Sequence, residues 1–202
     1  DGEMALKRRQ GRPPVIDNAY DRILDEAAAL FGQRGYESSS LSDVAKSIGV
    51  SKAAIFHYFP TKQDIYDAII VRTLKGLTET VSVAVQEETT GLARLRRFMI
   101  EHAAYFEENF WAFVTMLVGY GGMTDSLLKE EALALRDRYE GLLRQIIAGG
   151  IEAGELKNVD IAATGRGILS LLNWMARWFK PGTDTTAADI ADCNFIGIYP
   201  II

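Results

Sequence analysis

The sequence predicts an all-α fold, with a small helical N-terminal domain and a larger helical C-terminal domain. Apolar residues recur at the spacing of helices through most of the chain. Glycine and proline fall between these helical runs, and no stretch shows the features of a strand. With 202 residues, 48% of them hydrophobic and 24% charged, the chain can bury a sizeable core.

The stretch from Ser38 to Phe59 predicts two short helices joined by a sharp turn. The first has apolar residues at helical spacing: Leu41, Val44, Ala45 and Ile48. Gly49 allows the backbone of a tight turn, and Ser51 can cap a second helix that begins at Lys52. An amphipathic run over residues 17–35 precedes this pair and is expected to support it from behind. The pattern is that of a helix-turn-helix.

The second short helix has one apolar side and one polar side. Ile55 and Phe59 repeat at i, i+4 and are expected to face inward. The outer side then carries Lys52, Ala53, Ala54, His57 and Tyr58. Basic, small and hydrogen-bonding side chains suit a helix that lies in a DNA major groove. The sequence therefore predicts double-stranded DNA as a partner.

A basic arm, residues 1–16, precedes the predicted helix-turn-helix domain, residues 17–77. It contains Arg9 and Arg12, and the following prolines favour an extended backbone. These arginines could enter a minor groove or lie along phosphates. A disordered solubilising tail is an equally good interpretation.

Lys62 follows the break that Pro60 makes in the chain. Thr61 and Asp64 form a start resembling a capping box for the next helix, which places Lys62 at a helix N-terminus. Free amides and an ammonium both favour an anion there, so we expect Lys62 to contact a DNA phosphate. The alternative is a solvated lysine on a surface turn.

The net charge of −5 is unevenly distributed. Residues 7–62 hold nine Lys and Arg against six Asp and Glu, whereas residues 63–202 hold thirteen against nineteen. The positive excess thus lies beside the helix-turn-helix, as expected for a DNA-binding domain.

Residues 78–202 are expected to form a helical domain for ligand binding and dimerisation. The expected helices cover residues 63–88, 91–109, 126–153 and 160–180, and a last one starts within residues 186–190 and ends irregularly over residues 193–202. Apolar residues surround too much of the 160–180 helix for one neighbour, so we expect a partner subunit against Trp174 and Trp178.

Residues 110–120 are rich in aromatic residues and methionine and must be buried. They could be plain core, or they could line a cavity for a large apolar ligand, since pockets use the same residue types. His102 is more often a satisfied core histidine than a ligand-binding group. The candidate ligand-binding residues are Phe98, His102, Phe106, Phe110, Phe113, Met116, Leu117, Tyr120, Asn173 and Arg177.

The run LFGQRGYESSSLSDVAKSIGVSKAAIFHYFPTKQDIY resembles the DNA-binding segment of the tetracycline-repressor (TetR) family. The resemblance implies a homodimer that reads successive major grooves of a palindromic operator, and a C-terminal pocket whose ligand releases the DNA. On the family's pattern the base-facing positions are Lys52, Ala53, Ala54 and His57, and those near the DNA backbone are Ser40, Ser42, Phe56, Tyr58 and Lys62. Phe56 departs from the tyrosine frequent at its position.

The run LLNWMARWFKPG, followed by TAADIAD, is similar to family members that respond to acyl-coenzyme A thioesters. This resemblance implies that Arg177 or Lys180 meets ligand phosphates and that Asn173 meets a polar group. Both basic residues could equally be charges at the rim of a dimer interface. An apolar or acyl-CoA-type effector, rather than a cofactor, is therefore expected.

Other classes of protein fit the sequence less well. His57 and His102 fall in different predicted domains, and no P-loop, GxSxG, HExxH or dinucleotide fingerprint occurs, which argues against an enzyme and a metal site. A helical adaptor without DNA binding would leave the basic reading face unexplained. Cys193 is the only cysteine, and no apolar run could span a bilayer, so we expect a cytoplasmic protein without membrane contact.

Overall fold

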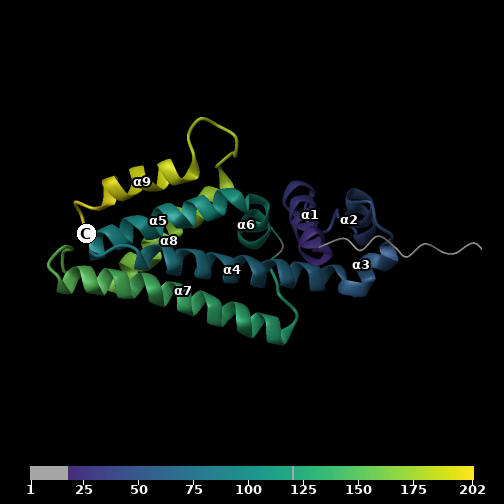
Figure 1. Ribbon diagram of the computed structural model, residues 1–202, viewed down its shortest axis with the longest axis horizontal. Helices are drawn as coiled ribbons and strands as arrows, with labels where there is room; N and C mark the ends of the chain where they lie inside the picture. The colour runs from purple at the N-terminus through teal and green to yellow at the C-terminus, as the bar shows by residue number, and fades with distance from the viewer. Residues whose placement is uncertain (1–17, 120) are drawn as a thin grey trace, which may run out of the picture.

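The computed structural model describes residues 18–119 and 121–202, and the regular structure within them is helical throughout (Figure 1). The first helices are α1 (Ala19–Arg34), α2 (Leu41–Ile48), α3 (Lys52–Tyr58), α4 (Lys62–Gln86) and α5 (Gly91–Glu108). They are followed by α6 (Phe110–Leu117), α7 (Ser126–Glu152), α8 (Ile161–Trp174), a 3₁₀ turn η1 (Met175–Arg177) and α9 (Ala187–Ile198). The predicted all-α fold is confirmed.

The small domain consists of α1, α2, α3 and the first part of α4. Its core joins fully buried side chains from each of these helices, among them Leu24, Val44, Ile55 and Ile65. Helices as short as α2 and α3 are marginal on their own in water. The burial of Val44 and Ile55 against α1 and α4 therefore holds them in place.

Helix α4 belongs to both domains. Its 25 residues span about 37 Å, and Figure 1 shows it running from the small domain along the large one. Leu74 lies in the core of the small domain, which also includes Ala112 of α6 and Leu135 of α7, whereas Leu77 begins the core of the large domain. We retain residue 77 as the proposed domain boundary, with α6 and α7 contributing to both sides of it.

Helix α5 lies at the centre of the large domain, where it packs against α4, α7, α8 and α9. Its buried side is rich in large side chains, and Phe106 meets the rings of Phe113 and Phe179 at centroid distances of 5.5 and 5.6 Å. Edge-on aromatic packing of this kind adds to the hydrophobic burial. The expected helix over residues 91–109 is confirmed almost to its ends.

The two C-terminal helices differ from the sequence-based expectation. The helix expected over residues 160–180 is α-helical from Ile161 to Trp174 and then tightens into η1. The irregular ending expected from residue 193 is wrong for residues 193–198, because α9 continues to Ile198. Buried Ala187, Ala191 and Phe195 pack toward α5 and outweigh the low helix propensity of Gly197.

Part of the sequence-based prediction lies outside the described residues. This applies to the basic arm with Arg9 and Arg12, and to Tyr120. Among residues 18–119 and 121–202, no helix combines the length and the apolar character that crossing a bilayer requires.

Candidate nucleic-acid interface and internal cavity

The turn between α2 and α3 is fixed by local interactions. Ser40 Oγ accepts a hydrogen bond from the Asp43 amide, and the Asp43 carboxylate accepts one from the Ser40 amide at 2.9 Å, which closes a capping box at the start of α2. Gly49 has φ 73°, a left-handed conformation that favours glycine. Ser51 Oγ then accepts from the Ala54 amide at 3.2 Å and caps α3. The predicted helix-turn-helix geometry is confirmed.

The acidic group in this cap is held in its charged form. Hydrogen bonds from the side chain and the backbone of Ser40 lower the pKa of Asp43 below its usual value. The resulting carboxylate lies at the N-terminus of α2, where the helix dipole favours a negative charge. The start of α2 is therefore well defined before any partner binds.

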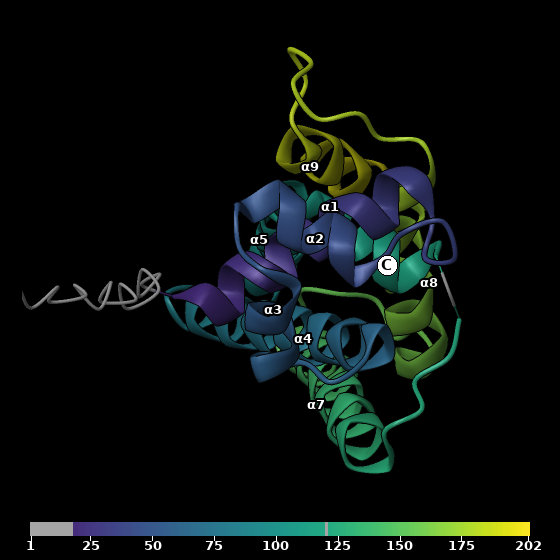
Figure 2. The same ribbon diagram turned by 90° about the vertical axis from the view of Figure 1, so that its right-hand side faces the viewer.

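Helix α3 turns its outer side to solvent at the end of the molecule (Figure 2). Ile55 is fully buried and anchors the inner side, whereas Lys52, Ala53 and His57 are exposed and Ala54 is half-buried. A short helix that is anchored on one side and free on the other has the shape that enters a major groove. The structure thus brings the four residues expected to read bases onto one accessible element.

The four exposed residues expected near the DNA backbone around α3 are Ser40, Ser42, Phe56 and Tyr58. Phe56 and Tyr58 each expose 43% of their surface, and Lys52 Nζ lies 5.4 Å from the centroid of the Phe56 ring. The Ser40 hydroxyl donates to the Asp43 carboxylate at 2.7 Å. Ser40 would have to give up this bond to donate to a phosphate through its side chain.

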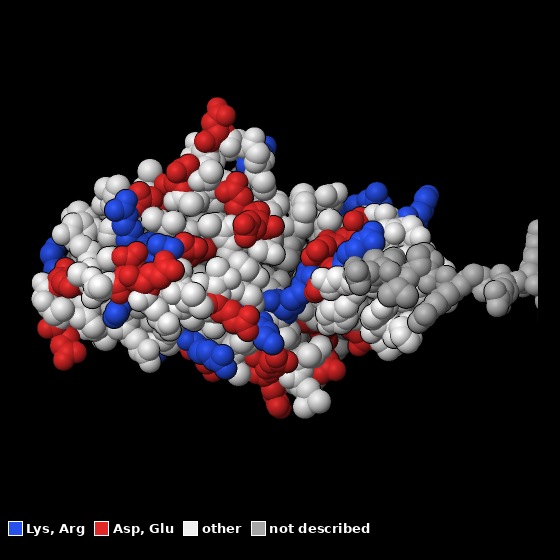
Figure 3. All heavy atoms as spheres, viewed as in Figure 1, with Lys and Arg blue, Asp and Glu red and all other residues white. Residues whose placement is uncertain are grey.

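The charges of the described part of the small domain are mixed, since residues 18–62 hold five Lys and Arg and five Asp and Glu. On the face shown in Figure 3, Lys and Arg side chains project from the small-domain end with Asp and Glu side chains beside them, and charges of both signs are spread over the large domain. The positive excess of residues 7–62 therefore belongs to residues 7–17, which lie outside the described residues.

Lys62 was expected to contact a phosphate at an open helix terminus, but its ammonium is turned toward the protein. Its Nζ donates to the carbonyl oxygens of Tyr36 at 2.7 Å and Ser39 at 3.0 Å, and it lies 4.1 Å from the centroid of the Tyr36 ring. Thr61 and Asp64 already close the N-terminus of α4 with a capping box. The ammonium therefore ties the loop between α1 and α2 to α4, a contact that sequence spacing does not indicate.

A partly open cavity of about 280 Å³ lies in the large domain, where α4, α5, α6, α7 and α8 meet. Its lining residues are Leu74, Leu77, His102, Phe113, Met116, Leu117, Arg136, Tyr139, Glu140, Leu169 and Asn173. An apolar wall with a few polar groups is typical of a site for a small molecule. Helix α6 contributes to the core and also lines this cavity, which is smaller than the large apolar ligand considered from the sequence would need, so ligand binding by residues 110–120 stays a prediction.

Five predicted ligand-binding residues line this cavity: His102, Phe113, Met116, Leu117 and Asn173. Phe98 and Phe106 instead lie fully buried in the surrounding core, because the inward side of α5 is broader than the cavity. Phe110 lines another hollow, between the domains. Arg177 is exposed, with its guanidinium 5.3 Å from the centroid of the Trp174 ring.

Sequence reasoning missed several lining residues, among them Arg136 and Tyr139. Tyr139 follows Leu135 and precedes Leu143 at four-residue spacing, so the inward side of α7 already indicated its position. Arg136 carries no such pattern. Its place beside the cavity depends on how α7 packs across α4.

His102 and Tyr139 form a buried polar pair at the cavity. His102 is 1% exposed, and its Nδ1 lies 2.8 Å from the Tyr139 hydroxyl. Burial lowers the pKa of His102 to about 4, while an interaction with Asn173 favours the charged form less strongly. Burial also raises the pKa of Tyr139 well above its usual value. Both rings are therefore neutral at physiological pH.

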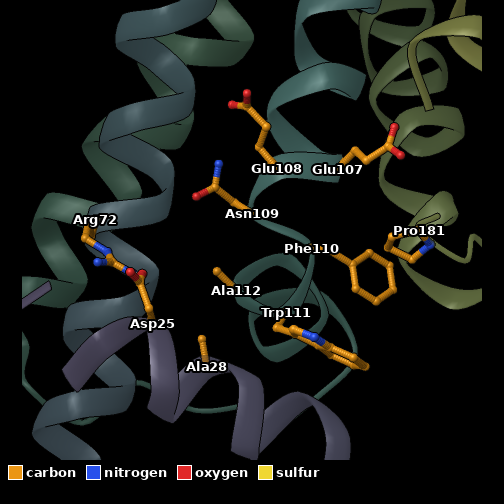
Figure 4. A pocket seen from close by; sticks show the side chains of 10 residues that line it. All are labelled: Asp25, Ala28, Arg72, Glu107, Glu108, Asn109, Phe110, Trp111, Ala112 and Pro181. Atoms are coloured by element: carbon orange, nitrogen blue, oxygen red, sulfur yellow. The ribbon is translucent and has the colours of Figure 1, made fainter. Parts of the chain in front are cut away.

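A more open hollow of about 490 Å³ lies at the junction of the two domains. Figure 4 shows Phe110, Trp111 and Pro181 on one side of it and Arg72 with Asp25 on the other. The Arg72 guanidinium pairs with the Asp25 carboxylate at 2.5 Å. The Arg72 charge is therefore already paired within the protein. The lining residues come mainly from α1 and α4 on one side and from α5 and α6 on the other, so the hollow lies where the two domains meet.

The end of α8 carries exposed large apolar side chains. Leu171 and Trp174 lie one turn apart and expose 43% and 60% of their surface, and Trp178, just after η1, exposes 50%. Clustered apolar exposure on an otherwise polar surface marks an interaction site.

No group of three or more His, Cys, Asp or Glu that could hold a metal occurs among the described residues.

The capped helix pair, the exposed α3 and the helical second domain with its internal cavity define a helix-turn-helix DNA-binding protein. Residues 23–69 match the family described as bacterial regulatory proteins, tetR family, and residues 88–194 match the tetracyclin repressor-like C-terminal domain. The chain belongs to the tetracycline-repressor family.

Solved structures of family members share the fold over nearly the whole chain. PfmR, a TetR family transcriptional regulator from Thermus thermophilus, is 44% identical, and the match covers 89% of this chain and 98% of PfmR with a TM-score of 0.83. AibR in complex with isovaleryl coenzyme A and operator DNA is 25% identical, with 90% and 98% covered and a TM-score of 0.79. Both are regulators rather than enzymes.

A curated relative matches over a shorter stretch. The biofilm operon icaADBC HTH-type negative transcriptional regulator IcaR of Staphylococcus aureus (strain Newman) is 28% identical over 90 residues, which is 45% of this chain and 48% of IcaR. The chain thus spans about half the length of the curated relatives that it matches first.

Proposed function

We propose that this protein is a transcriptional repressor that binds a palindromic operator and is released from it by a small apolar or acyl-CoA-type effector. The observation that carries the proposal is the exposed outer side of α3, with Lys52 and His57 on a helix that Ile55 anchors from behind. Since the partner is bacterial DNA, the protein acts in the cytoplasm.

The bases are read by Lys52, Ala53, Ala54 and His57. Two of these are alanines, so direct polar readout is limited, and methyl contacts to thymine and DNA shape contribute to the choice of sequence. The residues near the DNA backbone are Ser40, Ser42, Phe56 and Tyr58, with Arg9 and Arg12 of the arm and the loop held by Lys62 beside them.

The working form is a homodimer, because a palindrome requires two symmetric reading helices. The exposed Leu171, Trp174 and Trp178 supply an apolar surface at the end of α8 that a second copy covers. Arg177, which rests on the Trp174 ring, then lies at the rim of this interface, as does Lys180.

The effector occupies the 280 Å³ cavity of the large domain. Support comes from the mainly apolar lining, and AibR, which shares the fold, was solved with isovaleryl coenzyme A. The cation beside this cavity is Arg136, on α7. We therefore assign a ligand-phosphate contact to Arg136 in place of Arg177 or Lys180.

A gel-shift titration with DNA from the protein's own promoter tests the proposal. We expect a discrete retarded complex that competitor DNA of unrelated sequence does not displace, and loss of this complex when isovaleryl-CoA is added. Binding that is equally strong to all DNA would contradict the operator. Tight operator binding that no acyl-CoA weakens would contradict the effector class and leave DNA recognition standing.

A further inference from the structure

The cavity has a polar corner that its apolar walls do not explain. His102 of α5, Tyr139 of α7 and Asn173 of α8 reach the cavity from three different helices. His102 Nδ1 meets the Tyr139 hydroxyl, whereas its buried Nε2 makes no hydrogen bond of normal geometry among the described residues, although the Asn173 side chain lies close enough to favour the charged ring. A buried polar atom without a partner costs free energy, so this nitrogen stands out in a folded core.

The Tyr139 hydroxyl determines what this nitrogen offers. If the hydroxyl donates to Nδ1, the imidazole hydrogen resides on Nε2 and Nε2 is a donor. In the reverse arrangement the buried phenol hydrogen has no acceptor and a second polar atom is left unpaired, because His102 is the hydrogen-bond partner that the described residues provide for Tyr139. The arrangement with an Nε2 donor is therefore favoured.

A neutral donor in this setting suits a neutral acceptor on the ligand. The carboxamide of Asn173 lines the same cavity and can donate as well. The charged residues in the lining are Arg136 and Glu140, and the Glu140 carboxylate already pairs with the Arg144 guanidinium, which leaves Arg136 for an anionic portion of the ligand. The corner itself is formed by the uncharged His102, Tyr139 and Asn173, where an anion would be costly to bury and a carbonyl oxygen needs only hydrogen bonds.

We propose that His102 and Asn173 form a specificity site for the carbonyl oxygen of a short acyl thioester, with Tyr139 positioning the imidazole. This inference rests on the proposed function, which places the effector in the same cavity. The volume of about 280 Å³ lies just below the usual range for drug-sized ligands, so it suits a short or branched acyl chain.

The part of such a ligand beyond the acyl group can extend from the cavity into a neighbouring hollow. A neighbouring hollow of about 180 Å³ shares Met116 and Arg136 with the cavity and also holds Lys129. Two cations beside the shared wall suit the phosphates of a coenzyme A moiety. The carbonyl thus lies at the polar corner while the anionic portion extends past Arg136 toward Lys129.

Calorimetric titration of the full chain with matched ligands tests the assignment. The probes are isobutyryl-CoA, its S-isobutyl thioether analogue, which lacks the carbonyl oxygen, and free isobutyrate. We expect the thioester to bind about tenfold more tightly than the thioether, and isobutyrate to bind least. The ratio of thioester to thioether affinity should fall close to one in His102→Phe.

Two further variants separate recognition from packing. Asn173→Leu removes the other donor and should reduce the affinity ratio severalfold even if His102→Phe folds poorly. Tyr199→Phe removes a phenol hydroxyl just after α9, away from the cavity lining, and should leave the ratio unchanged.

Equal binding of thioester and thioether by the unaltered protein would overturn the inference, as would an unchanged ratio in a folded His102→Phe. Tighter binding of isobutyrate than of the thioester would do the same. If neither CoA compound binds while operator DNA does, the thioester assignment is wrong and the DNA-binding function stands.

Discussion

Thr115 of α6 donates a hydrogen bond to the backbone carbonyl oxygen of Ala28 in α1, with 3.2 Å between Thr115 Oγ1 and that oxygen. Both residues are buried. Next to them Trp111 packs so closely over Gly32 that a Cβ built on this glycine would lie 2.6 Å from the indole ring. Helix α6 therefore joins the wall of the internal cavity to the first helix of the DNA-binding domain.

Thr115→Val tests this junction. The change keeps the shape of the side chain and removes the hydrogen bond, so it should destabilise the protein by about 1 kcal/mol. Native-state hydrogen exchange should show the loss of protection in α1. Thr78→Val is the matched control, because Thr78 Oγ1 donates to the Leu74 carbonyl within α4. A similar loss of protection in α1 for both variants would show that the α6 contact is not special.

Lys62→Met tests whether this lysine is a structural tie. The variant keeps the apolar stem and removes the donor to the Tyr36 and Ser39 carbonyls, so the free energy of unfolding should fall by about 1 to 2 kcal/mol. Denaturant unfolding measures it. Lys75→Met, on an exposed part of α4, should have little effect. If Lys62→Met unfolds with unchanged free energy and its DNA binding depends less on salt, Lys62 contacts a phosphate, as the sequence led us to expect.

The buried His102 makes stability depend on pH. Its pKa is about 4 in the folded protein against an ordinary value of 6.5, so the unfolded chain binds a proton more readily. The stability from burying the neutral ring is complete above pH 6.5 and is lost as the pH falls toward 4. The loss is roughly 3 kcal/mol over this window. The free energy of unfolding of His102→Phe should fall by less over the same range, and parallel curves would contradict the buried neutral histidine.

Trp178→Glu tests the proposed dimer surface. Trp178 is half exposed beside Trp174, and a carboxylate there would be buried without a partner in the dimer. Sedimentation velocity should show a monomer for this variant and a dimer for the unaltered protein. Val83→Glu places the same charge at an exposed apolar position of α4 and should remain dimeric. A surviving Trp178→Glu dimer would move the interface to another surface.

The sequence predicted the parts of the fold that local chemistry determines. Gly49 and Ser51 define the turn and the start of α3 as expected, through a left-handed residue and a cap that involve only neighbours in the chain, whereas the cap that Ser40 forms on α2 was not predicted. The order of helices followed from apolar periodicity for the same reason. The all-α prediction could therefore be made without any knowledge of tertiary packing.

Contacts between distant residues were the part that the sequence could not supply. Lys62 meets carbonyls that lie 26 and 23 residues earlier, and α9 remains helical through Gly197 because α5 covers its apolar side. The cavity likewise depends on how five helices meet. Apolar periodicity predicted that Phe98 and Met116 face the inside of the domain. It does not distinguish Met116, which lines the cavity, from Phe98, which does not.

The most direct test of DNA recognition by α3 is selection of binding sites from a pool of random duplex DNA by the unaltered protein and by His57→Ala. The account predicts that the unaltered protein enriches two half-sites related by a two-fold axis, and that His57→Ala enriches a changed sequence within each half-site. Enrichment of no sequence, or the same half-sites for both proteins, would contradict reading of bases by this face of α3.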